Sequence, residues 1–375
     1  MSFSSTSATT RERELLEAAQ GGDEEAFGRV IEPYRGELHA HCYRMLGSAH
    51  DAEDAFQETA LRAWRGLGRF EGRSSLRSWL YTIATNTSLN LIERRPKRVL
   101  PIDYGPATDP HDGPGRPLIE SVWVEPFPDE QMGLEDGYAA PEASYELRES
   151  VELAFVAALQ HLPANQRAAL ILREVLGFSA QEVADALDTT VASVNSALQR
   201  ARKTIDERLP ERSQQTTLRA LDDEQVRATV EGYMDAMRRG DVDKVVSLLA
   251  EDAAWSMPPL ATWFHGHDGI REFLERYPLS GAWQWGHVPA RANGQPAVAS
   301  YTWRPEEGVY RPFSLNVFTL AGDRVQEITS FIARTADHLD PPEIHRLPDQ
   351  PPATARVADI FARFGLPDRL ADPPA

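Results

Sequence analysis

The chain has 375 residues and a formal net charge of −18 at pH 7, with 42% hydrophobic and 26% charged residues. This length favours two or three domains over a single core, and the composition is that of a soluble globular protein. The single cysteine, Cys42, excludes an intramolecular disulfide and fits a reducing cytoplasm. No apolar run approaches the roughly 20 residues that span a bilayer. We therefore expect a cytoplasmic protein with no membrane partner, no metal and no cofactor.

The first 98 residues differ in charge between their two halves. Residues 1–61 carry 5 basic and 12 acidic residues, whereas residues 62–98 carry 9 basic and 2 acidic ones. Arginines recur every three or four positions from Arg62 to Arg77, and the glycines between them predict a break in the helix. The stretch SLRSWLYTIATNTSLNLIERRPKR then interleaves aromatic, Asn, Ser and Thr side chains with a basic end. This combination favours contact with separated nucleic-acid strands over a merely solvated face.

Residues 99–146 hold more than half of the excess negative charge, with 1 basic residue against 11 acidic ones. Proline and glycine punctuate the stretch throughout, and no hydrophobic period is sustained. This pattern predicts a linker. Two interpretations stay open, a solvated spacer and a segment with a function of its own.

Residues 147–212 show strong helical periodicity. Helices are predicted over YELRESVELAFVAALQHLP and ANQRAALILREVLGF, and Ser179 caps the next one with Glu182 as the partner of a capping box. The residues DTT then form a turn, and VASVNSALQRARKTIDERL resumes the helix. A short helix, a tight turn and a longer helix with a polar front predict a helix-turn-helix. The alternative is an ordinary helical hairpin whose exposed face is basic.

These segments together resemble a bacterial sigma factor of the extracytoplasmic-function group. DAEDAFQETALRAW, residues 51–64, is similar to region 2.2, which docks on the clamp helices of RNA polymerase. SLRSWLYTIATNTSLNLIERR, residues 75–95, resembles regions 2.3 and 2.4, which open and read the −10 promoter element. FSAQEVADALDTTVASVNSALQRARKTI, residues 178–205, resembles region 4.2, which reads the −35 element. The resemblance covers about residues 12–210 and implies core RNA polymerase and promoter DNA as partners.

The resemblance also implies site residues. For polymerase binding these are Asp51, Glu53, Asp54, Gln57 and Glu58. For the −10 element they are Arg73, Ser74, Ser75, Arg77, Asn86 and Asn90. For the −35 element they are Ser193, Asn195, Ser196, Gln199 and Arg200, with Arg202 and Lys203 for phosphate. For the linker the family implies a path toward the RNA exit channel, with acidic residues as RNA mimics: Asp103, Asp109, Asp112, Asp129 and Glu130.

Residues 222–340 predict a further domain. DDEQVRATVEGYMDAMRRGDVDKVVSLLAEDAAW and HDGIREFLERY predict helices, and four alternating runs follow, with an AGD hairpin signal between the last two. Helices followed by antiparallel strands predict an α+β cone, and the segment resembles the SnoaL-like branch of the nuclear-transport-factor-2-like fold. Pocket candidates are Trp255, His265, Trp285, Trp303 and Asn316. Only about half of such strand residues can share one face, and aromatic residues on such strands are more often core than cofactor site.

We therefore expect a multi-domain chain with two all-α sigma domains, the second with a helix-turn-helix, followed by an α+β cone with a curved antiparallel sheet. The expected bounds are 12–98 for region 2, 99–146 for the linker, 147–212 for region 4, 222–340 for the cone and 341–375 for a Pro-rich tail. A short helix in that tail docks either on the cone or on the sigma domains.

The expected function is promoter-specific initiation by core RNA polymerase. The cone is expected to be a regulator and not a catalyst, with a small ligand or a protein as its partner. One alternative is an isomerase, hydrolase or cyclase of the SnoaL-like class tethered to a DNA-binding module. The other is a repressor that binds duplex DNA alone, against which the net negative charge argues.

Overall fold

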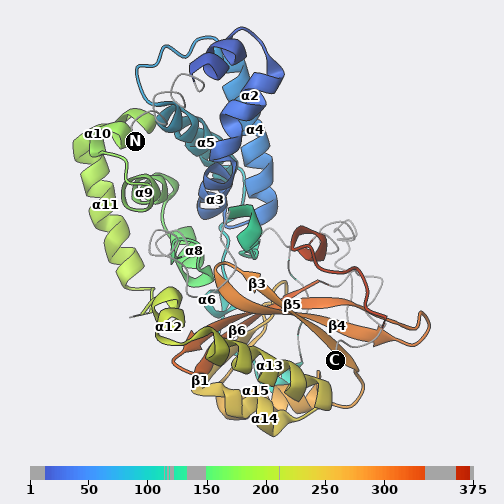
Figure 1. Ribbon diagram of the computed structural model, residues 1–375. Helices are drawn as coiled ribbons and strands as arrows, with labels where there is room; N and C mark the ends of the chain where they lie inside the picture. Colours follow the sequence, from blue (N-terminus) through green and yellow to red (C-terminus); the bar gives the residue numbers. More distant parts are fainter. Residues whose placement is uncertain are drawn as a thin grey trace. The chain divides into compact units, whose positions relative to one another are not determined.

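The computed structural model describes residues 13–113, 115, 118, 122–132, 149–210, 212–333 and 360–371. The chain forms two compact units (Figure 1). The first unit contains Met1–Lys97, Gln131–Gly133 and Ala158–Arg208, and the second contains Arg98–Glu130, Leu134–Ala157 and Leu209–Ala375. Over the described ranges, no helix is long and apolar enough to cross a membrane.

The first unit is all helical. Its N-terminal helices are α2 (Glu24–Ile31), α3 (Arg35–Leu46), α4 (Ala49–Leu67) and α5 (Leu76–Ile92). Gly47 ends α3 in the left-handed conformation at φ 66°, and the side chain of Ser48 then caps α4. The glycine-rich stretch predicted as a break separates α4 from α5, which begins after its N-cap Ser75.

Region 4, from Ala158 onward, supplies most of the rest of this unit. After α8 (Leu153–Gln160) come α9 (Ala164–Leu170), the π-helix η5 (Ile171–Val175), α10 (Ala180–Ala186) and α11 (Val191–Asp206). The predicted capping box is present, because Ser179 Oγ accepts from the Glu182 backbone and the Glu182 carboxylate accepts from the Ser179 backbone. Val183, Val194 and Leu198 are buried between α10 and α11. This geometry confirms the predicted helix-turn-helix.

The second unit contains a six-stranded sheet (Figure 1). Its helices are α6 (Pro101–Tyr104), α12 (Gln214–Ala220), α13 (Asp223–Arg239), α14 (Val242–Leu248) and α15 (Gly266–Arg276). Of these, α13, α14 and α15 cover the concave face of the sheet (Figure 1). Its strands are β1 (Leu249–Ser256), β2 (Trp263–His265), β3 (Trp285–Ala292), β4 (Gln295–Arg304), β5 (Val309–Ala321) and β6 (Arg324–Ile332). Helices before strands give the predicted α+β cone.

The sheet has the order β2-β1-β6-β5-β4-β3. The AGD signal is the turn between β5 and β6, as predicted, and the β3–β4 turn is formed by Asn293 and Gly294, both at positive φ. All the neighbouring strands are antiparallel except β1 and β6, which are parallel. The sheet is therefore mixed and not wholly antiparallel as predicted. The chain reaches β1 from helix α14 and not through a hairpin with β6.

The two faces of the sheet have different covers. The concave face packs on α13 and α15 through a core that includes Tyr233, Phe273 and Phe318. On the other face, Tyr301 contacts Phe361 of the C-terminal helix, drawn in red in Figure 1. The backbone of Leu370 also exchanges hydrogen bonds of 2.8 and 3.0 Å with Tyr310. Residues 360–371 of the tail therefore dock on the cone, which resolves for this segment the alternative that the sequence left open.

Candidate nucleic-acid and polymerase interface

The acidic residues predicted for polymerase binding lie on α4, but they are not equivalent. The side chains of Glu53, Asp54 and Glu58 are 43–51% exposed, whereas that of Asp51 is 1% exposed. Asp51 forms an ion pair with Arg95, and its carboxylate does not face the solvent. The exposed carboxylates and Gln57 thus form the solvent-facing surface of α4. Asp51 instead stabilises the helix through its buried ion pair with Arg95.

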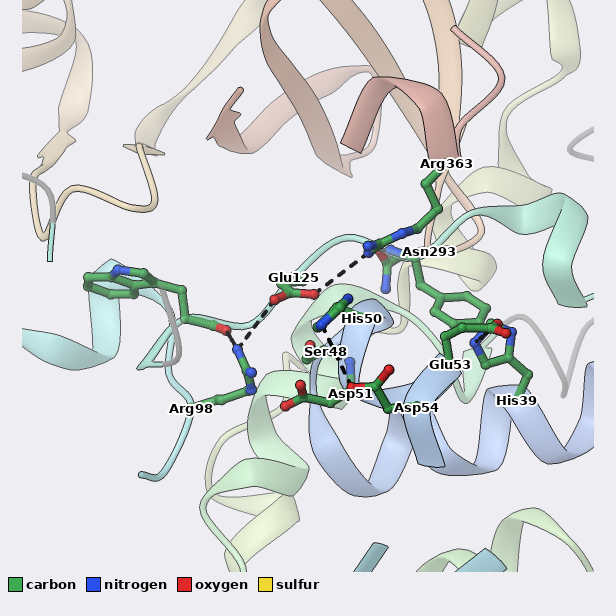
Figure 2. A network of polar contacts seen from close by, with 12 residues as sticks. His39, Ser48, His50, Asp51, Glu53, Asp54, Arg98, Glu125, Asn293 and Arg363 are labelled. Carbon is green, nitrogen blue, oxygen red and sulfur yellow. Dashed lines mark hydrogen bonds and ion pairs between the residues drawn. The ribbon is translucent and has the colours of Figure 1, made fainter. Parts of the chain in front are cut away.

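His39 on α3 and His50 on α4 contact acidic residues of this surface (Figure 2). His39 lies 3.4 Å from Glu53, and His50 lies 3.7 Å from Asp54. The ligand atoms of His50, Asp51 and Asp54 lie within 4.8 Å of one another, as a metal site would require. Because the Asp51 carboxylate is already paired with Arg95, the cluster is better explained as a structural network of charges.

The residues predicted for the −10 element divide into two sets. Arg73, Ser74 and Ser75 are exposed in the segment between α4 and α5, while Asn86 and Asn90 are exposed one turn apart on α5. Both asparagines therefore face the same side of α5.

Arg77 is placed differently from the other −10 candidates. Its guanidinium lies 4.9 Å from the centroid of the Tyr81 ring and 5.0 Å from that of Phe178, and its Nε lies 3.2 Å from a Glu37 carboxylate oxygen. In this conformation Arg77 joins α5 to the start of the helix-turn-helix.

The residues predicted for the −35 element all lie exposed on α11. Thr190 caps the helix, and its Oγ1 lies 3.0 Å from Ser193 Oγ, so Ser193 is partly engaged by the cap. Arg202 forms an ion pair of 2.5 Å with Glu174, whereas Lys203 is 4.0 Å from Glu207. The exposed residues are Ser193, Asn195, Ser196, Gln199, Arg200, Arg202 and Lys203. The front of α11 thus offers amide and hydroxyl groups, and its later turns offer cations, as base and phosphate contacts require.

Regions 2 and 4 pack against each other within the first unit. Ser78 Oγ on α5 donates to Glu182 Oε1 at 3.1 Å, and Gln160 Nε2 donates to the Arg44 carbonyl at 3.1 Å. The buried Arg167 donates to the carbonyl of Met45, to Gln160 Oε1 at 2.6 Å and to the carbonyl of Leu162 at 3.2 Å. Burial lowers the pKa of Arg167 to about 10, so the guanidinium stays charged at neutral pH.

The five pocket candidates of the cone do not lie together. Trp255, Trp285 and Asn316 are buried on the concave face, while His265 is exposed on β2 and Trp303 packs against Tyr310 on the other side of β4. Asn316 Nδ2 donates to Ser300 Oγ at 2.8 Å, and Trp255 Nε1 donates to Ser330 Oγ at 2.9 Å. These hydrogen bonds satisfy polar groups inside the aromatic core.

His287 also lies on this concave face and was not among the predicted residues. It is stacked on Trp285, two positions earlier on β3, at 6.3 Å between ring centroids. The period of two along a strand was the signal that linked it to Trp285. Burial lowers the pKa of His287 to about 3, so the ring is neutral at pH 7.

The described part of the acidic linker is held by the cone. Trp263 Nε1 donates to the Gly105 carbonyl at 2.9 Å, the Thr108 amide donates to the Trp263 carbonyl at 2.8 Å, and Tyr277 Oη donates to the Pro110 carbonyl at 3.2 Å. His111 Nε2 lies 3.1 Å from a carboxylate oxygen of Glu272. Residues 105–111 of the linker are therefore bound to the cone and do not form a free spacer.

Glu125, within the linker, forms ion pairs with Arg98 and with Arg363 of the tail (Figure 2). Its carboxylate lies 3.6 Å from Arg98 and 3.8 Å from Arg363 of the C-terminal helix. Asp129, one of the predicted RNA mimics, is buried and lies 3.1 Å from Arg291 of β3. Sequence alone gave no signal for these pairs, because their partners lie far along the chain.

Comparisons with known proteins agree with this arrangement. Residues 30–98 match the family described as Sigma-70 region 2, residues 152–205 match Sigma-70, region 4, and residues 230–363 match the SnoaL-like domain. The ECF RNA polymerase sigma factor SigG of Mycobacterium tuberculosis is 41% identical over 346 residues, which cover 92% of this chain and 85% of that protein.

Two further proteins are similar over different lengths. The RNA polymerase sigma-H factor of Pseudomonas aeruginosa is 31% identical over 53% of this chain and 94% of its own length. The crystal structure of the Mycobacterium tuberculosis sigma factor SigJ has a TM-score of 0.50 and 23% identity, and covers 80% of this chain and 95% of that chain. Its likeness supports the fold. From the matched regions and the extent of the similarity to SigG, the chain belongs to the extracytoplasmic-function sigma factors and carries a C-terminal SnoaL-like domain.

Proposed function

We propose that this sigma factor is regulated by its own cone, which restrains the connection between regions 2 and 4. The observation that carries the proposal is the binding of residues 105–111 along β2 and α15, through Trp263, Tyr277 and Glu272. A linker of 48 residues could extend over roughly 150 Å at about 3.3 Å per residue. Held on the cone, the same segment cannot extend to separate the two DNA-binding regions.

The exposed surface of α4 is proposed to bind core RNA polymerase, through Glu53, Asp54, Gln57 and Glu58. The exposed residues between α4 and α5, with Asn86 and Asn90, are proposed to meet the −10 element. The polar front of α11 is proposed to read the −35 element. The support is that each set is exposed, while Asp51 and Arg77 are engaged inside the unit.

A regulatory cone is favoured over a tethered enzyme by the position of its acidic groups. Glu327 on β6 accepts a hydrogen bond from Thr329 Oγ1 at 3.0 Å and lies on the face opposite Trp255. Burial, together with the negative charge of Asp103 from the linker, raises the pKa of Glu327. Its surroundings are thus the docked linker and not the aromatic core.

Run-off transcription with core polymerase tests the regulatory proposal. A triple variant, Trp263→Phe, Tyr277→Phe and His111→Ala, removes three polar contacts between linker and cone and keeps most of the packing. We expect more transcript per holoenzyme than from the wild-type chain, because the linker is released. Lys244→Ala, an exposed change on α14, is the matched control. An unchanged yield from the triple variant, with hydrogen exchange showing that residues 98–113 are released, would contradict the proposal.

A further inference from the structure

The turn between β3 and β4 forms hydrogen bonds with chain segments that lie outside the cone in sequence. Asn293 and Gly294 have φ values of 58° and 69°, which suit a two-residue hairpin turn. The Asn293 side chain is fully buried. Its Oδ1 accepts from the Phe127 amide at 2.9 Å, and its Nδ2 donates to the Val151 carbonyl at 2.8 Å. One amide group therefore holds both the linker, at Phe127, and the start of region 4, at Val151.

The start of region 4 and the segment that follows it attach at this same place. At the start of region 4, the Leu153 amide donates to Gln295 Oε1 at 2.9 Å. After region 4, Gln215 Nε2 donates to the Gly294 carbonyl at 2.8 Å, and Gln214 Nε2 donates to the Leu320 carbonyl at 3.2 Å. These glutamines are 1–4% exposed, so their hydrogen bonds are shielded from water.

Glu152 joins the start of region 4 directly to the segment that follows region 4. Its Oε2 accepts from the Gln214 amide at 3.0 Å, and its Oε1 accepts from the Gln215 amide at 2.6 Å. The residue is 5% exposed. One carboxylate thus joins residues that are 62 and 63 positions apart in the chain. The loop that it closes contains all of α9, α10 and α11.

We propose that Glu152, Gln214, Gln215, Asn293 and Gln295 form a single cooperative joint through which the cone holds both ends of region 4. Region 4 is then an insertion into the cone domain and not a domain that precedes it. The joint is separate from the linker contacts on β2 and α15, so it stands whether or not those contacts regulate transcription. Because the two ends share Glu152 and the same turn, release of one end removes the partners of the other.

Hydrogen exchange of individual backbone amides in the full chain, measured at pH 8, tests this cooperativity. Asn293→Asp keeps the acceptor for Phe127 but replaces the donor to Val151 with a carboxylate oxygen. Asn293→Gly keeps the positive φ of the turn and removes both contacts. Gln284→Glu is the matched amide-to-acid control, since Gln284 is exposed just before β3.

The expected result in Asn293→Asp is at least about tenfold faster exchange at Leu153, and a similar change at Gln214 and Gln215, which Asn293 does not bond. Phe127 should stay protected in Asn293→Asp and lose protection in Asn293→Gly. The control should match the wild type. Unchanged exchange at Gln214 and Gln215, with Leu153 accelerated or not, would overturn the joint. If amides of β4 and β5 also exchange faster in Asn293→Asp, the exchange at Leu153, Gln214 and Gln215 in Asn293→Gly decides whether the joint is cooperative.

Discussion

Replacing Arg167 with methionine should destabilise the packing of region 4 on region 2 severely. Arg167 is 5% exposed, and its guanidinium donates to one side-chain oxygen and three backbone carbonyls, one of them in region 2. Methionine fills a similar volume but leaves these buried acceptors without a donor. Removing one partner of a buried charged network typically costs about 3–5 kcal/mol, and each unsatisfied buried acceptor about 1–3 kcal/mol. We therefore expect a loss of about 3–5 kcal/mol.

Native-state hydrogen exchange of the α9 and α3 amides measures this loss locally, without requiring the whole chain to unfold in one step. At about 1.4 kcal/mol per tenfold change, exchange should accelerate by roughly two to four orders of magnitude. Arg200→Met on exposed α11 is the matched control and should change stability by no more than about 0.5 kcal/mol. An effect below about 1 kcal/mol for Arg167→Met would refute the reasoning, because water would then replace the lost donors at little cost.

Two further predictions concern α11 and Glu152. Gln199→Ala should weaken holoenzyme binding by about 1–3 kcal/mol at one base pair and relax the sequence preference at that position. Lys203→Ala should instead weaken binding to all promoters alike and flatten the salt dependence of holoenzyme binding. If the two variants behave alike across promoter variants, this division between base and phosphate contacts is wrong. Burial raises the pKa of Glu152 from an ordinary 4.5 to about 7, so the folded second unit binds a proton more tightly than the unfolded chain. Its stability should fall as pH rises from 4.5 to about 7 and then level off. Urea unfolding at several pH values checks this, and an unchanged slope in Glu152→Gln would exclude Glu152 as its source.

The helix-turn-helix was predictable because its signals are local. Ser179 and Glu182 are three residues apart and form the capping box that their spacing predicts. The apolar residues Val183, Val194 and Leu198 follow helical periods and are buried as expected. The order of helices and strands in the cone, and the hairpin after β5, were predictable for the same reason.

The placement of the linker could not be predicted, because its partners are remote and its bonds use backbone groups. The Gly105 carbonyl meets a side chain 158 residues away, and the Phe127 amide meets one 166 residues away. A proline- and glycine-rich composition describes the absence of regular structure but carries no information about such contacts. The same holds for the parallel pairing of β1 with β6, which a pattern of alternating strands does not distinguish from antiparallel pairing.

The candidate site was predictable as a set of exposed polar residues but not in its details. Asp51 and Arg77 belong to the matched motifs, yet Asp51 is buried against Arg95 and Arg77 is stacked on Tyr81 and Phe178. Only tertiary packing separates these two from their exposed neighbours. Likewise, Trp303 and His265 share the composition of the pocket candidates, but strand alternation and the edge position of β2 keep them out of the concave core.

Binding of one fluorescent promoter duplex, titrated at physiological salt with the free chain and with its holoenzyme, tests the sigma-factor account most directly. A net charge of −18 repels duplex DNA at long range, and the region 2–region 4 contacts hold α5 and α11 in one compact unit. The account predicts tight, sequence-specific binding by the holoenzyme and weak binding by the free chain. Nanomolar, sequence-specific binding by the free chain would contradict it and favour a repressor.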